Sequence, residues 1–252
     1  MSTLYIVATP IGNLEDLSFR AARILGEVDA VACEDTRVTR KIYERYQITP
    51  PRIRFSCHEH NEKQQAAARI LGLLNEGRSV ALVTDGGVPG VSDPGYHTIN
   101  LCREHGHTVE MLPGPSAVTT ALVLSGLSGA SFTFKGFPPR KPGRRKRFLE
   151  MEKDQPHTLV FFESPHRIVA FIEDAFEVLG DRLAAVCFEL TKQFERMQRG
   201  YLSEIAALLK NDSNLRGEIT VVIAGNNPKF LSEEEEEEKE KSPFMNFPLP
   251  GR

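Results

Sequence analysis

Short apolar segments alternate with helical patterns through the first half of the chain, and this alternation restricts its fold more than any other feature. Apolar segments predict strands at residues 4–8, 30–33, 53–55, 79–84 and 108–112. Apolar residues recurring at helical spacing predict helices near residues 17–28 and 61–76, and a polar helix is expected near residues 36–46. The run SVALVT is apolar throughout, as is typical of a strand in the middle of a parallel sheet. We therefore expect an α/β domain with a largely parallel sheet.

The second half of the chain has a different sequence pattern, because its apolar segments are longer and separated by charged stretches. Strands are predicted at residues 131–135, 158–162, 184–189 and 218–224. We expect an N-terminal α/β domain over residues 1–126 and a C-terminal α/β domain over residues 127–226. Residues 227–252 hold a glutamate run and a proline-rich end that cannot bury apolar surface, so we expect this tail to be disordered.

Charge is unevenly distributed along the chain. The net charge is −3, but residues 232–252 hold seven glutamates against two lysines and one arginine, which leaves the rest of the chain at about +1. Residues 135–147 contain seven lysines and arginines and no acidic residue. This basic segment suits a polyanionic partner, because neutralised phosphates release counterions. A solvated surface is the alternative interpretation.

Several classes of protein are disfavoured by the sequence. No apolar run approaches the roughly 20 residues that cross a bilayer. The strand-like start LYIVA follows no basic leader, so we expect a cytoplasmic protein without a signal peptide. The four cysteines form no CxxC pair, which favours reduced and mostly buried thiols. His58 and His60 lack the HExxH spacing, so we expect a polar loop there and no metal.

Three loops rich in glycine and proline each follow a predicted strand, at residues 9–14, 85–95 and 113–117. Loops at the carboxyl ends of parallel strands form the ligand crevice of open α/β sheets. Glycine lets a ligand approach the backbone closely, and proline restricts the loop. Neither GxGxxG nor a phosphate loop ending in GK[ST] is present. We therefore expect a ligand other than a dinucleotide or a nucleoside triphosphate held in the usual manner.

Eight motifs in order resemble the tetrapyrrole-methylase superfamily, and within it the bacterial enzymes that methylate a ribose of small-subunit ribosomal RNA. The resemblance covers roughly residues 4–225. The N-terminal motifs are ATPIGNLEDLSFRA from residue 8, ACEDTR from 32, SDPG from 92 and LPGPSAVTTAL from 112. The C-terminal motifs are FKGFPPRK from residue 134, FFESPHR from 161, ELTKQFE from 189 and RGE from 216.

The resemblance implies two α/β domains with S-adenosylmethionine in a cleft between them. It also implies a homodimer that methylates a cytidine ribose in the decoding region of 16S rRNA, within the small ribosomal subunit. One position departs from the family pattern, since Val88 stands where a threonine hydroxyl is usual. The positions that match the family's cofactor contacts are Pro10, Asp85, Gly86, Val91, Ser116, Ala117 and Phe162.

A ribose hydroxyl is a weak nucleophile and benefits from a nearby base or a polarising cation. Candidates lie in the motifs CEDTR, ESPHR and ELTK, and the alternative for each is a buried ion pair that joins the domains. We expect Glu34, Arg37, Glu163 and Lys192 to be catalytic. In the basic segment, we expect RNA contacts from Arg140, Lys141, Arg144, Arg145 and Arg147. A 2′-hydroxyl target would also explain a preference for RNA over DNA.

Two other functions are compatible with the same resemblance. One is another methylase of the superfamily, acting on a tetrapyrrole precursor or on a modified histidine of a translation factor. The other is a non-catalytic RNA- or ribosome-binding protein that has kept the fold. The basic segment and the motifs CEDTR and ESPHR favour the ribosomal RNA enzyme over the first, and the three loops argue against the second. The fold alone cannot choose among the three.

Overall fold

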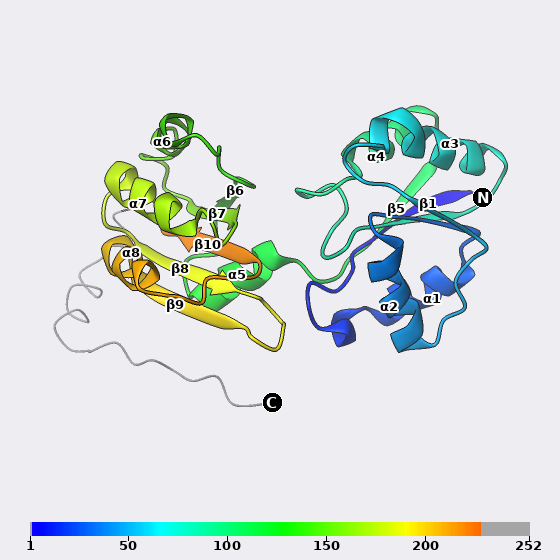
Figure 1. Ribbon diagram of the computed structural model, residues 1–252. Coiled ribbons are helices and arrows are strands. Elements are labelled where there is room, and N and C mark those ends of the chain that lie inside the picture. The colour runs from blue at the N-terminus through cyan, green and yellow to red at the C-terminus, as the bar shows by residue number, and fades with distance from the viewer. Residues whose placement is uncertain (1, 228–252) are drawn as a thin grey trace.

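The computed structural model describes residues 2–227 and contains two five-stranded sheets. In Figure 1 the two sheets lie side by side, and the chain passes from the first to the second between β5 and α5. All but the first residue of the expected tail at 227–252 lies outside the described residues.

The first sheet is entirely parallel, with the strand order β3-β2-β4-β1-β5, which confirms the α/β prediction for this half. Every residue of the central β4 is buried, as its continuous apolar sequence predicts. Its strands are β1 (Thr3–Val7), β2 (Ala30–Cys33), β3 (Ile53–Ser56), β4 (Val80–Val83) and β5 (Thr108–Leu112).

Helices cover both faces of this sheet (Figure 1). Side chains of α1 (Phe19–Glu27) and α2 (Thr36–Tyr46) form one core with the sheet. Side chains of α3 (Ala67–Asn75) and α4 (Tyr96–Glu104) form another on the opposite face. A 3₁₀ turn, η1 (Leu14–Asp16), precedes α1.

The predicted helix at residues 61–76 is not α-helical along its whole length. It begins with a π-helical turn, η2 (Glu62–Ala66), and only then continues as α3. The buried Glu62 carboxylate accepts hydrogen bonds of 2.9 Å from both the backbone N–H and the hydroxyl of Thr98. The wider turn is therefore tied to α4 by a tertiary contact, which helical periodicity does not report.

The second sheet is mixed, with the order β6-β7-β10-β8-β9. β6 pairs with β7 in parallel, and the remaining pairs are antiparallel. Leu149 and the apolar faces of α7 and α8 pack on one side of this sheet. Its elements are β6 (Phe132–Phe134), α6 (Pro142–Glu150), β7 (Thr158–Glu163), α7 (Ile168–Leu179), β8 (Leu183–Phe188), β9 (Arg196–Tyr201), α8 (Leu202–Lys210) and β10 (Ile219–Ile223).

Helix α5 (Ala117–Ser125) packs on the second sheet, although we expected it to close a domain ending at residue 126. Its apolar residues Val118, Ala121 and Leu122 share a core with Val160 and Val222 of the second sheet. By packing, the chain therefore changes sheets just before α5 rather than after it. The N-terminus of α5 consequently lies at the junction of the two sheets.

The cysteines agree with the sequence expectation. Cys33, Cys57, Cys102 and Cys187 are all buried and free of disulfide bonds. Burial raises the pKa of the Cys57 and Cys187 thiols to about 12, so both stay protonated at neutral pH. Neither is suited to act as a nucleophile.

Candidate active site

The three loops rich in glycine and proline meet at one edge of the first sheet. They follow β1, β4 and β5, and these three strands are parallel neighbours, so their carboxyl ends coincide. The backbones of Thr9 and Gly87 exchange two hydrogen bonds of 2.9 Å, and the Thr9 hydroxyl donates to the Thr84 carbonyl. The CEDTR motif follows β2, the neighbour of β4, and joins the same edge.

Close packing of backbones holds these loops together. A Cβ on Gly86 would lie 3.3 Å from the Pro10 carbonyl oxygen. A Cβ on Gly114 would lie 3.0 Å from the Cβ of Ala8. Pro10 itself is buried, whereas Val91 is exposed. The expected cofactor residues of the first two loops therefore lie in one tightly packed set of turns.

The third loop ends at Ser116, which begins α5 as its N-cap residue. The Ser116 carbonyl accepts hydrogen bonds from the hydroxyls of Thr119 and Thr120, and its own hydroxyl makes no capping hydrogen bond. Ala117 packs against the core between α5 and the second sheet. Ser116 thus has a side chain available at the junction of the two sheets.

The second sheet contributes the ELTK segment to the same region. A Cβ on Gly12 would lie 2.6 Å from the Thr191 hydroxyl and 2.8 Å from the Leu190 carbonyl. The Asn13 backbone N–H also donates to the Thr191 hydroxyl over 3.1 Å. The first loop is therefore in direct contact with the segment after β8, and only glycine fits at position 12.

Backbone strain is concentrated around these loops. Ser92, Glu189 and Thr191 have left-handed backbone conformations, with φ angles of 62°, 50° and 63°. Such conformations are unfavourable for residues with side chains and persist where the surroundings enforce them. Two of these residues belong to the ELTK segment and the third to the loop after β4.

Four carboxyl groups share the space in front of this edge. Asp93 is the most perturbed, because burial and the charges of Glu34, Asp85 and Glu218 raise its pKa to about 7. Burial also raises the pKa of Glu34 and of Asp85. We call Glu34, Asp85, Asp93 and Glu218 the acidic cluster. The prediction from sequence included Glu34 and Asp85 but missed Asp93, whose place in the SDPG motif is its only sequence signal.

The acidic cluster has few cationic partners of its own. Glu34 accepts a backbone hydrogen bond from Asp85, and Asp85 accepts one from Asp35. Within residues 2–227, Asp93 has neither a hydrogen bond nor an ion pair. Of these four carboxyl groups, Lys192 pairs with Glu218 alone, so the negative charge of the cluster is only partly balanced. Such an excess of negative charge favours a cationic ligand, because opposite charge stabilises the ionised carboxylates. The sulfonium and ammonium groups of S-adenosylmethionine fit this requirement.

The structure separates the predicted catalytic residues. The Lys192 ammonium lies 2.8 Å from Glu189 and 3.1 Å from Glu218, and Lys192 packs against Gly12, so it lies beside the acidic cluster. Although burial acts in the opposite direction, the Lys192 ammonium lowers the pKa of Glu189. Glu34 and Lys192 therefore approach the same region from the two sheets.

Glu163 and Arg37 are placed differently. The Glu163 carboxylate is buried, and Arg167 binds it at 2.6 and 2.7 Å. Both residues belong to the C-terminal half of the chain, so this ion pair does not join the two domains. Arg37 is 86% exposed and pairs with Asp35, holding the pKa of that carboxyl down at about 2. It lines a cavity of about 340 Å³ beside α2, together with Arg40 and Tyr43.

The basic segment forms a loop followed by α6, and one of its arginines is not available to RNA. Arg145 is only 4% exposed, and its guanidinium lies 2.6 Å from Asp174 of α7. The expectation that Arg145 contacts RNA is therefore wrong, because its charge is buried and already paired. The exposed members of the expected set are Arg140, Lys141, Arg144 and Arg147.

Within the described residues, no group of three or more histidine, cysteine, aspartate and glutamate side chains is placed to hold a metal ion. No helix in residues 2–227 is long and apolar enough to cross a membrane.

The chain matches a known family of proteins over most of its length. Residues 3–206 match the family of Tetrapyrrole (Corrin/Porphyrin) Methylases. The fold resembles uroporphyrin-III-C-methyltransferase from Thermus thermophilus, with a TM-score of 0.64 and 20% identity over 90% of this chain and 95% of that one. It also resembles a diphthine synthase, with a TM-score of 0.64 and 17% identity over 88% and 90% of the two chains.

Relatives at higher sequence identity define a narrower group within this family. The chain is 44% identical to the ribosomal RNA small subunit methyltransferase I of Halalkalibacterium halodurans over 92% of its length and 79% of the relative's. It is 44% identical to the protein of the same name from Thermotoga maritima over 89% and 99% of the two lengths. The chain belongs to the tetrapyrrole methylase family, and within it to the group of ribosomal RNA small subunit methyltransferase I.

This membership confirms the expected family and fold class. It also confirms a methyltransferase whose cofactor is S-adenosylmethionine.

Proposed function

We propose that the protein transfers a methyl group from S-adenosylmethionine to the ribose 2′-hydroxyl of a cytidine in the decoding region of 16S rRNA. Relatives that share 44% of its residues are named as small-subunit ribosomal RNA methyltransferases. We further propose that the acceptor is the RNA within the small ribosomal subunit, and that the enzyme works in the cytoplasm as a homodimer.

One observation carries the proposal: the acidic cluster and the basic segment adjoin each other. The acidic cluster suits the sulfonium of the cofactor. Gly136 lies in the loop that leads to Arg140, the first exposed cation of the basic segment, and a Cβ on it would lie 3.4 Å from the Ser92 hydroxyl of the loop after β4. A polyanion bound by the basic residues would therefore reach the loops that hold the cofactor.

We assign cofactor binding to the residues of the loops and the facing sheet, and S-adenosylmethionine supplies the methyl group when bound. Asp85 and the acidic cluster supply negative charge, and Gly86 and Gly114 keep the backbone turns narrow. Ser116 offers a hydroxyl at the junction of the sheets. The proposed set is Pro10, Asp85, Gly86, Val91, Ser116, Ala117 and Phe162.

We assign proton acceptance from the ribose hydroxyl to Asp93. A carboxylate with a pKa near 7 is a suitable general base at neutral pH, since it is partly ionised and still able to hold a proton. Lys192, fixed by Glu189 and Glu218, places a positive charge beside the acidic cluster. That ammonium is positioned to stabilise negative charge on the acceptor oxygen.

The direct test offers three acceptors to the purified protein together with S-adenosylmethionine labelled in its methyl group. The acceptors are undermethylated small ribosomal subunits, a 16S rRNA transcript and uroporphyrinogen III. We expect label in the RNA and none in the tetrapyrrole, and a variant carrying Asp85→Ala and Ser116→Ala should lose both cofactor affinity and transfer. Label in uroporphyrinogen alone would contradict the proposal.

A further inference from the structure

The loop between β6 and α6, residues 136–141, is restrained by several hydrogen bonds to its backbone. We call it the Phe137 loop. At its start, the Lys135 N–H donates to the Val160 carbonyl over 2.9 Å, and the Gly136 carbonyl accepts from the Phe162 N–H over 3.0 Å. Gly136 adopts a left-handed backbone conformation with a φ angle of 63°. The loop therefore leaves β6 through a turn that favours glycine.

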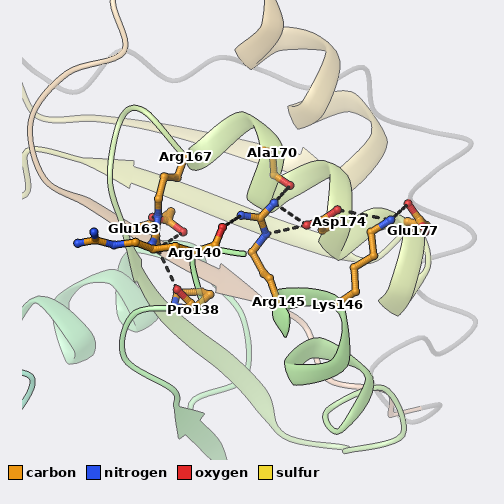
Figure 2. Close-up of polar contacts among 9 residues, drawn as sticks. All are labelled: Pro138, Arg140, Arg145, Lys146, Glu163, Arg167, Ala170, Asp174 and Glu177. Atoms are coloured by element: carbon orange, nitrogen blue, oxygen red, sulfur yellow. Dashed lines mark hydrogen bonds and ion pairs between the residues drawn. The ribbon is translucent and has the colours of Figure 1, made fainter. Parts of the chain in front are cut away.

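A buried ion pair fixes the middle of the Phe137 loop. Arg167 binds both oxygens of the buried Glu163 carboxylate and also donates to the Pro138 carbonyl over 3.1 Å. Figure 2 shows Arg167, Glu163 and Pro138 converging in this way. Glu163 thus pairs with the charge of Arg167, while a further N–H of the same guanidinium restrains the loop backbone.

A second buried ion pair fixes the end of the loop. Arg145 binds Asp174 over 2.6 Å and donates to the Arg140 carbonyl over 3.5 Å and to the Ala170 carbonyl over 3.3 Å. In Figure 2 the Arg145 guanidinium lies between these two carbonyl groups and Asp174. The partly buried Arg167 and the buried Arg145 therefore restrain the backbone on both sides of the Pro138–Pro139 dipeptide.

The side chain that this restrained loop presents is an exposed aromatic ring. Phe137 is 58% exposed. Its ring centroid lies 5.6 Å from that of Phe162, which in turn packs on Phe134 at 4.8 Å. Burial in the core does not explain the position of Phe137, because more than half of the side chain faces solvent. The rigid backbone and the exposed ring together are what a stacking surface requires.

The surroundings of Phe137 fit an RNA base. On one side the loop lies against Ser92 of the second cofactor loop, and on the other it continues into Arg140 and Lys141, both exposed. Unpaired bases in RNA complexes stack on aromatic side chains while neighbouring cations bind the phosphates. A base on Phe137 would therefore lie next to the nucleotide that enters the cofactor site.

We infer that Phe137 is a base-stacking residue that binds an unpaired nucleobase of the RNA substrate close to the target nucleotide. This inference rests on the proposed function and adds the element that holds the acceptor strand. Arg145 and Arg167 serve it as positioning residues, because they touch the loop backbone and not the base.

The test compares Phe137→Ala, Phe137→Leu and Phe137→Trp with the wild-type protein on a 16S rRNA transcript and on undermethylated small subunits. Loss of one stacked base should raise the Kd and the KM for RNA between about 5-fold and 150-fold. Leucine keeps the apolar bulk but lacks the aromatic face, so it should resemble alanine, and tryptophan should retain binding. The affinity for S-adenosylmethionine, measured by calorimetry, should not change in any of the three.

Phe19→Ala is the matched control, because that ring on α1 is 95% exposed and lies outside the site. It should leave both affinities unchanged. Unchanged RNA affinity in Phe137→Ala would overturn the inference, as would weaker cofactor binding, which would make the ring a cofactor contact. A change in oligomeric state would likewise overturn it in favour of a subunit contact. If the wild-type protein fails to methylate RNA, both the proposed function and the role of Phe137 are wrong.

Discussion

Two neighbouring arginines of α6 should respond in opposite ways to the same substitution. Arg145 is buried against Asp174, whereas Arg144 is exposed. Removing one partner of a buried ion pair usually costs about 3–5 kcal/mol, because the other charge stays buried. The lower end applies to Arg145→Gln, since Lys146 remains 3.7 Å from Asp174 and partly compensates it. We expect a loss of about 3 kcal/mol, or roughly 6–12 °C in Tm for a chain of this size.

Thermal unfolding and salt-dependent RNA binding separate the two roles. Arg145→Gln should lower the Tm and, measured well below that temperature, leave the slope of log affinity against log salt unchanged. Arg144→Gln should keep the Tm and reduce the magnitude of that slope by about 0.7–0.9, as one lost phosphate contact predicts. Combining Arg145→Gln with Asp174→Asn should cost less than the sum of the two single changes. A Tm within 2 °C, or about 1 kcal/mol, of the wild type in Arg145→Gln would show that the buried ion pair does not stabilise the fold as expected.

Substitutions of Asp93 and of two glycines test the charge of the site and the packing of the chain. Because burial and nearby carboxylates raise the pKa of Asp93 to about 7, the folded protein keeps a proton that the unfolded chain releases near pH 4. Stability should therefore fall as the pH rises from about 4 to about 7, and Asp93→Asn should flatten this slope in a series of Tm measurements. Gly12→Ala should lower the Tm and weaken cofactor binding roughly tenfold, because its Cβ overlaps Thr191 and Leu190. Gly72→Ala, with open space around it, should instead stabilise α3 by up to about 1 kcal/mol.

Features that depend on local sequence were predictable. Apolar runs locate the strands of the first sheet, and the Gly/Pro-rich loops after β1, β4 and β5 lie at one edge because parallel neighbours end together. Strand β9 escaped prediction, since its sequence RMQRGY carries almost no apolar residue and lies at the edge of its sheet. Edge strands tolerate such polar sequences because one side faces solvent.

Features that depend on tertiary partners were not predictable from the same patterns. Arg145 looks like its neighbours in the sequence, and only the approach of Asp174 from α7 makes it a buried ion-pair partner. Helix α5 follows the third loop directly, yet its apolar residues pack on the second sheet. Asp93 became a candidate base only when Glu34 and Glu218, from segments distant in sequence, were brought close to it and to Asp85 of its own loop.

Nucleoside mass spectrometry identifies the RNA atom that receives the methyl group. Undermethylated small subunits are incubated with the protein and S-adenosylmethionine, and the 16S rRNA is then digested to nucleosides and to fragments. We expect 2′-O-methylcytidine in a fragment from the decoding region, and its absence when Asp85→Ala and Ser116→Ala are combined. Methylation on a base, or no new methyl group in the RNA with the wild-type protein, would contradict the proposed function.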